Sequence, residues 1–169
     1  LKRRVEFLGH VIENGKVYPS GQKVEAVRKF PVPSNVKQMQ SFLGLSGYFR
    51  KFIPRYSTIA RPLSDLLKTN VKYVFGEKEN AAFIQLKEML VSKPVLNLYV
   101  TGAETELHTD ASMFGYGAIL LQKSADDNMF HPVYYSSGKT TPAEQNYSSY
   151  ELEVLAIIKA LKNFRVYLI

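Results

Sequence analysis

Residues 106–121, ELHTDASMFGYGAILL, and residues 148–161, SSYELEVLAIIKAL, decide the fold of this chain. The first stretch predicts a β-hairpin, because a short strand is followed by glycines and then by an apolar run. Residues 132–136 add a third strand rich in β-branched and aromatic residues. The second stretch predicts an amphipathic helix, because Ser148 and Glu151 form a capping-box pattern ahead of apolar residues at helical spacing. Three strands are therefore expected to lead into a long helix.

Two acidic residues stand out in these elements. Asp110 lies near the end of the first strand, and Glu153 lies in the early turns of the helix. Hydrolysis of a phosphodiester with two metal ions needs carboxylates that converge on one point, because Mg²⁺ prefers oxygen ligands. Acids at strand ends and helix starts also occur for reasons of turn chemistry and dipole complementarity. The pair alone therefore leaves both a metal site and a purely local role open.

Longer motifs resemble a known family. Residues 107–122 and 131–169 are similar to the start of the ribonuclease H domain of gypsy-type LTR retrotransposon reverse transcriptases. Upstream, residues 7–33, 41–68 and 81–96 resemble the end of the palm, the thumb and the segment that joins the thumb to ribonuclease H. The motifs follow one another in the family's order over almost the whole chain, which is more specific than any single motif.

The resemblance assigns catalytic roles to both acids. Asp110 in TDAS matches the first metal-binding aspartate of the ribonuclease H site, and Glu153 in EVLA matches the helix glutamate. Glu151 is a competitor, but its offset from Ser148 suits a helix cap. The implied cofactor is Mg²⁺, with Mn²⁺ as an alternative. The family's remaining acids, and the paired aspartates of its polymerase site, have no match between residues 1 and 169.

The N-terminal segment predicts a β-hairpin with an Asn14–Gly15 turn. In the resembled family this hairpin positions the primer end near the polymerase site. The resemblance therefore implies nucleic-acid binding by Phe7, Leu8, Gly9 and His10. Without the resemblance, a simple hairpin that contacts nothing is the expected interpretation.

A longer helix is expected at roughly 36–53, with one face in the core. Gln40, Gly44 and Tyr48 are spaced by four and fall on a neighbouring strip. Glycine inside a helix costs about 1 kcal/mol relative to alanine, so Gly44 needs a reason. By resemblance to the retroviral thumb helix, the strip would face the minor groove of a template-primer duplex. Helix-helix packing through a small residue is the alternative.

The charge distribution favours a polyanionic partner. Residues 1–75 contain 14 Lys and Arg against 4 Asp and Glu, a net charge of +10, whereas residues 76–169 contain 8 against 11, a net of −3. A basic half attracts nucleic acid through counterion release, which gives salt-dependent binding without sequence preference. Arg50, Lys51 and Arg55 at the end of the long helix are the first candidates for phosphate contacts. A run of charge can also be no more than a solvated face.

The expected fold class is α+β. A palm-end β-hairpin and a helical thumb-like region should precede a truncated ribonuclease H-like fold of three strands and a long helix. The expected domains are residues 1–25 for the palm end, 26–99 for the thumb and connecting helices, and 100–169 for the ribonuclease H-like part. Further local predictions are a helix at 57–67 interrupted by Pro62, an extended piece at 72–75 on one side of a small hairpin, and a helix at 79–91.

The implied function is that of a fragment of a reverse transcriptase and ribonuclease H, which copies RNA into DNA and hydrolyses the RNA strand of RNA-DNA hybrids by two-metal catalysis. A non-catalytic nucleic-acid-binding relic or host-adopted module is the alternative, and a purely structural subunit is a third. Expected partners are an RNA-DNA hybrid or template-primer duplex and the rest of a Pol polyprotein, with the oligomeric state left open.

Composition excludes other kinds of site. The chain has no cysteine and three widely separated histidines, so disulfides and thiolate zinc sites are excluded. It has no apolar run near 18 residues and no signal pattern, so no membrane partner is expected, and an intracellular, cytoplasmic location is the default. The resemblance places the parent in a virus-like particle.

Overall fold

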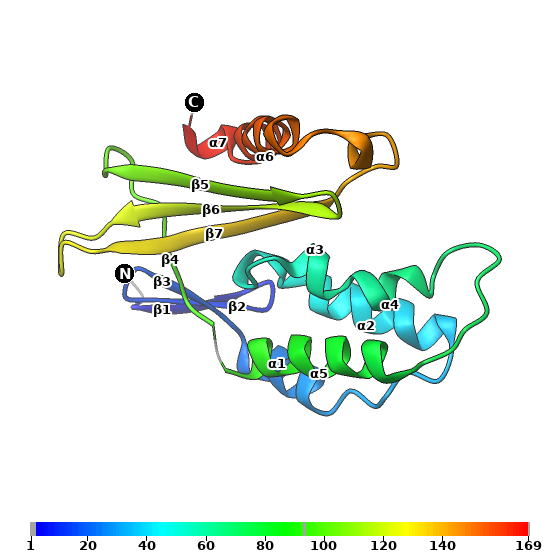
Figure 1. Cartoon of the computed structure of the whole chain (residues 1–169). Helices are drawn as coiled ribbons and strands as arrows, with labels where there is room; N and C mark the ends of the chain where they lie inside the picture. The colour runs from blue at the N-terminus through cyan, green and yellow to red at the C-terminus, as the bar shows by residue number, and fades with distance from the viewer. Residues whose placement is uncertain (1–2, 93, 169) are drawn as a thin grey trace.

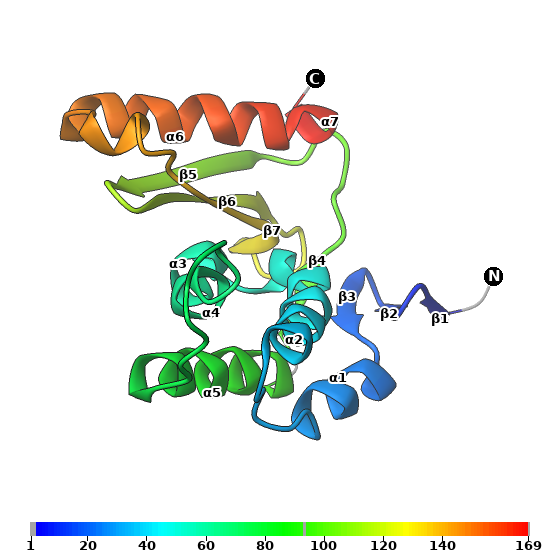
Figure 2. The same ribbon diagram turned by 90° about the vertical axis from the view of Figure 1, so that its right-hand side faces the viewer.

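The computed structural model describes residues 3–92 and 94–168. These residues form two antiparallel sheets, one with strand order β1-β2-β3-β4 and one with order β5-β6-β7. Figure 1 shows the second sheet as a middle layer, with the C-terminal helix on one side and the other helices on the opposite side. The turned view agrees (Figure 2), and the predicted α+β class is confirmed.

The first sheet is a meander extended by a short fourth strand. Its strands are β1 (Arg4–Phe7), β2 (His10–Glu13), β3 (Lys16–Pro19) and β4 (Leu96–Asn97). Asn14 and Gly15, with φ of 50° and 71°, form the predicted turn between β2 and β3. A second tight turn at Leu8 and Gly9, with φ of 47° and 71°, joins β1 to β2 and was not predicted.

The helical layer surrounds an aromatic core. Its elements are α1 (Gly21–Arg28), α2 (Val36–Tyr48), the short 3₁₀ helix η1 (Arg50–Phe52), α3 (Tyr56–Ile59), α4 (Arg61–Asp65) and α5 (Glu77–Val91). Phe42 of α2 is fully buried, and its ring centroid lies 5.3 Å from that of Phe30 and 4.6 Å from that of Phe83. No helix within the described ranges is long and apolar enough to span a bilayer.

Proline chemistry explains where the helices end. The prediction of one helix over 36–53 is wrong at its C-terminal end, because α2 stops at Tyr48 and η1 follows. Ile53 is extended, with φ of −117° and ψ of 113°, as the ring of the following Pro54 requires. The predicted interruption at Pro62 is confirmed, since α3 and α4 are separate and Pro62 lies in the first turn of α4.

The segment 72–75 is not part of a hairpin, and that prediction is wrong. It runs without strand pairing, and two aromatic side chains anchor it. The Tyr73 hydroxyl donates to the Pro33 carbonyl at 2.7 Å, and the Phe75 ring meets Phe83 edge-on at 6.2 Å. These contacts, rather than a β-ladder, attach the segment to the helical core.

The second sheet carries the long helix on one face. Its strands are β5 (Thr105–Ser112), β6 (Gly115–Lys123) and β7 (Phe130–Lys139), and they are followed by η2 (Glu144–Asn146), α6 (Ser149–Asn163) and α7 (Arg165–Leu168). Leu120 of β6 packs with Ala160 and Phe164 in a second core, and all three are at most 1% exposed. The three predicted strands and the helix are confirmed, although the helix breaks at Phe164.

The other face of this sheet docks on the helical layer through polar contacts that we call the seam. The seam comprises Ser57, Asp65, Ser137 and Lys139. The backbone N–H and hydroxyl of Ser57 donate to the Ser137 hydroxyl at 3.0 and 2.9 Å, and all of these groups are buried. At the rim, the Lys139 ammonium lies 3.3 Å from an Asp65 carboxylate oxygen. Because buried polar groups are costly to leave unpaired, the seam fixes the two parts of the chain relative to each other.

Candidate nucleic-acid interface and metal site

The tip of the first hairpin and the end of α2 meet in space. The Tyr48 hydroxyl donates a hydrogen bond to the Leu8 carbonyl, which lies in the turn between β1 and β2. Phe7 and Leu8 leave their side chains 65% and 69% exposed beside this contact. Two segments that the sequence presented as separate nucleic-acid contacts thus form one continuous surface.

His10 fixes the geometry of this junction. Its ring centroid lies 5.3 Å from that of Tyr48 and 5.7 Å from that of Phe52. Its Nδ1 lies 3.0 Å from the Leu8 carbonyl and must donate, because a carbonyl can only accept. Nε2 is buried and has no partner within the described residues. Burial, together with the positive charge of Lys51, lowers the pKa of His10 and favours the neutral ring.

One face of α2 extends the same surface. Gln40, Gly44 and Tyr48 are exposed, and Lys37 lies one turn earlier on this strip. Lys37 was not predicted as part of this strip, although residues three and four positions apart lie on the same face of a helix and Lys37 precedes Gln40 and Ser41 by that spacing. A Cβ built on Gly44 would meet nothing within 4 Å. Packing within the described chain therefore does not explain this glycine, and the helix-packing alternative is not supported.

The three basic residues after α2 make different contacts within the described chain. Arg50 donates to the Ser137 carbonyl, and its guanidinium carbon lies 5.6 Å from the centroid of the Tyr56 ring. Lys51 is half-buried with its ammonium 5.4 Å from the centroid of the Phe52 ring, and burial lowers its pKa. Arg55 is exposed and pairs with Asp110 on the second sheet. Phosphate binding by the three together stays a prediction.

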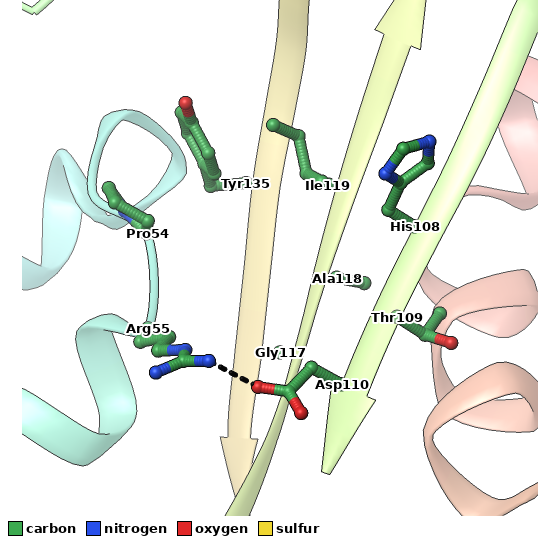
Figure 3. Close-up of a pocket in the computed structure, with 9 residues that line it drawn as sticks. All are labelled: Pro54, Arg55, His108, Thr109, Asp110, Gly117, Ala118, Ile119 and Tyr135. Atoms are coloured by element: carbon green, nitrogen blue, oxygen red, sulfur yellow. Dashed lines mark hydrogen bonds and ion pairs between the residues drawn. The ribbon is translucent and has the colours of Figure 1, made fainter. Parts of the chain in front are cut away.

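Asp110 lies on the face of β5 that looks toward Pro54 and Arg55. Its carboxylate Oδ2 is 2.5 Å from an Arg55 terminal nitrogen, and both side chains are well exposed. Figure 3 shows Asp110 turned toward Arg55, whereas the neighbouring Thr109 points to the side of α6. The pair borders a pocket of about 160 Å³ to which Gly117, Ile119 and Tyr135 also contribute.

Glu153 lies on α6, which packs along β5. Figure 2 places the first turns of α6 at the same end of the sheet as the C-terminal end of β5. The rival acid Glu151 caps the helix, since its carboxylate accepts from the Ser148 backbone N–H at 2.8 Å and its own N–H donates back at 3.4 Å. The Ser148 N–H bond lowers the pKa of Glu151. Glu153 makes no such bond within the described residues.

The donor set fits Mg²⁺ in kind. Asp110 and Glu153 are exposed carboxylates, and Mg²⁺ commonly keeps several waters while one or two carboxylates hold it. Within residues 3–92 and 94–168, no group of three or more His, Asp or Glu side chains is arranged to hold a metal ion. The Asp110 carboxylate is also engaged by Arg55. The shared metal site therefore stays a prediction.

The fold and these residues define a class. A β-hairpin and thumb-like helices lead into an antiparallel sheet that carries Asp110, and a helix with Glu153 covers this sheet. These are the parts of a reverse-transcriptase segment joined to a ribonuclease H-like sheet. The chain belongs to the family described as the RNase H-like domain found in reverse transcriptase, whose model matches residues 75–169. The match begins upstream of the boundary expected near residue 100.

The chain is similar to polyproteins of transposons. The chain is 39% identical over 170 residues to a retrovirus-related Pol polyprotein from transposon 297 of Drosophila melanogaster. The alignment covers 100% of this chain and 16% of that protein. It is 39% identical over 165 residues to the transposon Tf2-3 polyprotein of Schizosaccharomyces pombe. This alignment covers 98% of this chain and 12% of that protein. The chain thus spans a small part of each relative. This agrees with the resemblance to gypsy-type elements.

Solved structures share the fold. A foamy viral protease-reverse transcriptase in complex with double-stranded DNA superposes with a TM-score of 0.84 and 21% identity, over 99% of this chain and 29% of that one. A foamy viral protease-reverse transcriptase in complex with an RNA/DNA hybrid gives 0.82 and 22%, over 98% of this chain and 22% of that one. At such identities the likeness establishes the arrangement of elements alone.

Proposed function

We propose that this chain is part of a retrotransposon enzyme that copies RNA into DNA and hydrolyses the RNA strand of RNA-DNA hybrids. The observation that carries the proposal is the junction of Tyr48 with Leu8, which joins the hairpin tip and the α2 strip into one exposed surface. The solved foamy viral structures, which contain double-stranded DNA or an RNA/DNA hybrid, support a duplex as the ligand.

In this proposal the surface holds the duplex by shape and charge. Lys37 provides a positive charge at one end of the strip, and Gly44 leaves room for a sugar edge in the middle. Tyr48 and the exposed Phe7 and Leu8 provide flat or apolar contact at the other end. None of these groups reads a base sequence, so binding should depend on salt and not on sequence.

The nuclease half of the proposal rests on Asp110 and Glu153 as ligands of Mg²⁺, or of Mn²⁺. When bound, such ions stabilise the negative charge that develops on the phosphodiester during in-line displacement. The chain contributes rigid placement, because Asp110 is on a strand paired along β6 and Glu153 is on a helix packed against that sheet. Arg55 holds the Oδ2 atom of Asp110, so a metal ion would have to displace Arg55 from this oxygen or bind through Oδ1.

A two-part experiment tests the proposal. The affinity of this chain for a labelled RNA-DNA hybrid should fall linearly on logarithmic axes as salt rises, in a fluorescence anisotropy titration. In a protein extended into the neighbouring polyprotein sequence, Asp110→Asn and Glu153→Gln should abolish Mg²⁺-dependent cleavage and retain hybrid binding. Cleavage that survives in either variant would refute that assignment, and salt-independent or absent binding would refute the interface.

A second candidate function is a non-catalytic nucleic-acid-binding module. The observation that favours it is the Arg55–Asp110 ion pair, which gives Asp110 a structural partner. Under this function the two acid variants would leave every nucleic-acid activity of the extended protein unchanged. The same cleavage assay therefore separates the two functions.

A further inference from the structure

Arg55 occupies an unusual backbone position. Its φ of 52° and ψ of 32° place it in the left-handed region at the start of α3, directly after Pro54. Among the described non-glycine residues with positive φ, only Leu8 and Arg55 are not asparagine. The left-handed conformation is sterically unfavourable for a side chain such as arginine, and such outliers concentrate at functional sites. Leu8 already lies in the candidate interface, which makes Arg55 the outlier to explain.

The left-handed elbow directs the Arg55 side chain onto the second sheet. The side-chain stem passes over β6, where a Cβ built on Gly117 would lie 3.7 Å from the Arg55 Cγ. The guanidinium then reaches Asp110, which pairs with Gly117 in the ladder between β5 and β6. A residue of the helical layer, 55 positions earlier in sequence, thus delivers a positive charge to the candidate metal-binding carboxylate.

We propose that Arg55 is a further residue of the candidate nuclease site, a positioning residue that holds the Asp110 carboxylate and competes with the divalent cation for it. This inference rests on the proposed function, since it assigns Asp110 to the metal. A guanidinium and a cation cannot both take the same carboxylate oxygen at contact distance. Arg55 holds the Oδ2 atom, so a cation must either displace it from that oxygen or bind through Oδ1 while the nearby guanidinium repels it, and both routes weaken metal binding.

The exposure of the Arg55 and Asp110 side chains sets how strongly Arg55 competes with a metal ion for Asp110. The Arg55 and Asp110 side chains are 69% and 63% exposed, so water screens their attraction. Exposed ion pairs contribute about 0.2 to 1 kcal/mol, and 1.4 kcal/mol corresponds to a tenfold change in affinity. Removing Arg55 should therefore tighten divalent-cation binding at Asp110 by up to about fivefold, and high salt should reduce the difference.

Mn²⁺ binding to this chain tests the inference without any activity assay. Mn²⁺ broadens nearby NMR signals, and the amide of Gly117 reports on Asp110 because the two residues are paired across the ladder. Arg55→Asn is the informative variant, since asparagine tolerates the left-handed conformation. Lys68→Gln removes an equal charge from an exposed lysine that pairs with Asp65, and it measures the effect of net charge alone.

We expect Arg55→Asn to shift the Mn²⁺ titration at Gly117 to lower concentration than in the wild type and in Lys68→Gln. Asp110→Asn should remove the broadening in either background. Equal titrations for wild type and Arg55→Asn, with broadening that still requires Asp110, would overturn the role of Arg55 and leave the proposed metal site intact. Broadening that persists in Asp110→Asn, or its absence in all variants, would overturn the metal assignment itself and the competition with it.

Discussion

The hydroxyl of Ser137 on β7 accepts two hydrogen bonds from Ser57 on α3, one from its backbone N–H at 3.0 Å and one from its hydroxyl at 2.9 Å. Both residues are less than 9% exposed, and they lie 80 positions apart in sequence. This contact ties the helical layer to the second sheet, and the Arg50 guanidinium, which donates to the Ser137 backbone carbonyl, crosses the same junction. The Ser137 side chain is therefore a suitable position at which to test how the two parts are held together.

Ser137→Ala should destabilise the chain by about 1 to 3 kcal/mol, because it leaves the buried Ser57 N–H without its acceptor. Urea denaturation followed by circular dichroism measures the loss. Ser136→Ala is the matched control, since the half-buried Ser136 hydroxyl accepts from the exposed Asn163 side chain at the end of α6 and makes no contact with Ser57. Equal stability of the two variants would show that the Ser57 contact does not hold the layers together.

Gly44→Ala should raise the free energy of unfolding by up to about 1 kcal/mol, since alanine favours a helix and the site offers open space. The same change should weaken binding of an RNA-DNA hybrid, because in the proposed interface the added methyl group would lie where the sugar edge approaches. Gln85→Ala on the exposed face of α5 should leave affinity unchanged. A more stable protein with unaltered affinity would remove Gly44 from the interface.

Tyr48→Phe should loosen the turn at Leu8 and Gly9, because it deletes the donor to the Leu8 carbonyl and keeps the ring against His10. The contact is exposed, so the loss of stability should stay near 1 kcal/mol or below. We expect a lower heteronuclear NOE at Gly9 and weaker hybrid binding. Tyr150→Phe, on an exposed tyrosine of α6, is the control. An unchanged NOE at Gly9 would argue against the coupling.

His10 predicts a specific dependence of stability on pH. Burial and the nearby Lys51 lower its pKa in the folded chain below the ordinary value of 6.5. The unfolded chain then binds the proton more readily, so the stabilisation is complete above pH 6.5 and is lost as pH falls through the folded pKa. His10→Phe, which keeps an aromatic ring, should flatten the change in urea midpoint between pH 7 and pH 5. Identical pH profiles would contradict a depressed pKa.

Local chemistry made several elements predictable from the sequence. The Ser148 and Glu151 capping box forms the start of α6 as expected. Asn14 and Gly15 form the predicted turn, because both tolerate positive φ, and Pro62 separates two helices. In each case neighbouring residues supply the free energy that selects the conformation, and the pattern can therefore be read without knowledge of the tertiary contacts.

Long-range contacts were not predictable in the same way. β4 contains two residues and pairs with β3 almost eighty positions earlier, so it leaves no periodic signal. The left-handed turn at Leu8 contradicts the local preference of leucine, and the surrounding hairpin and Tyr48 impose it. The Arg55 ion pair depends on docking of the helical layer on the second sheet. Leu8 and Arg55 both depart from the local preference of their residue types, and both lie at candidate functional positions, where such conflicts are expected.

The Ser57–Ser137 contact also relates the two candidate sites to each other. It joins the helical layer, which carries the candidate duplex surface at Tyr48, to the second sheet, which carries the Asp110 carboxylate. Under the proposed function, a nucleic acid bound at the first site would be cut at the second at a separation set by this docking. Fragment lengths would thus be dictated by the protein and not by the sequence of the RNA.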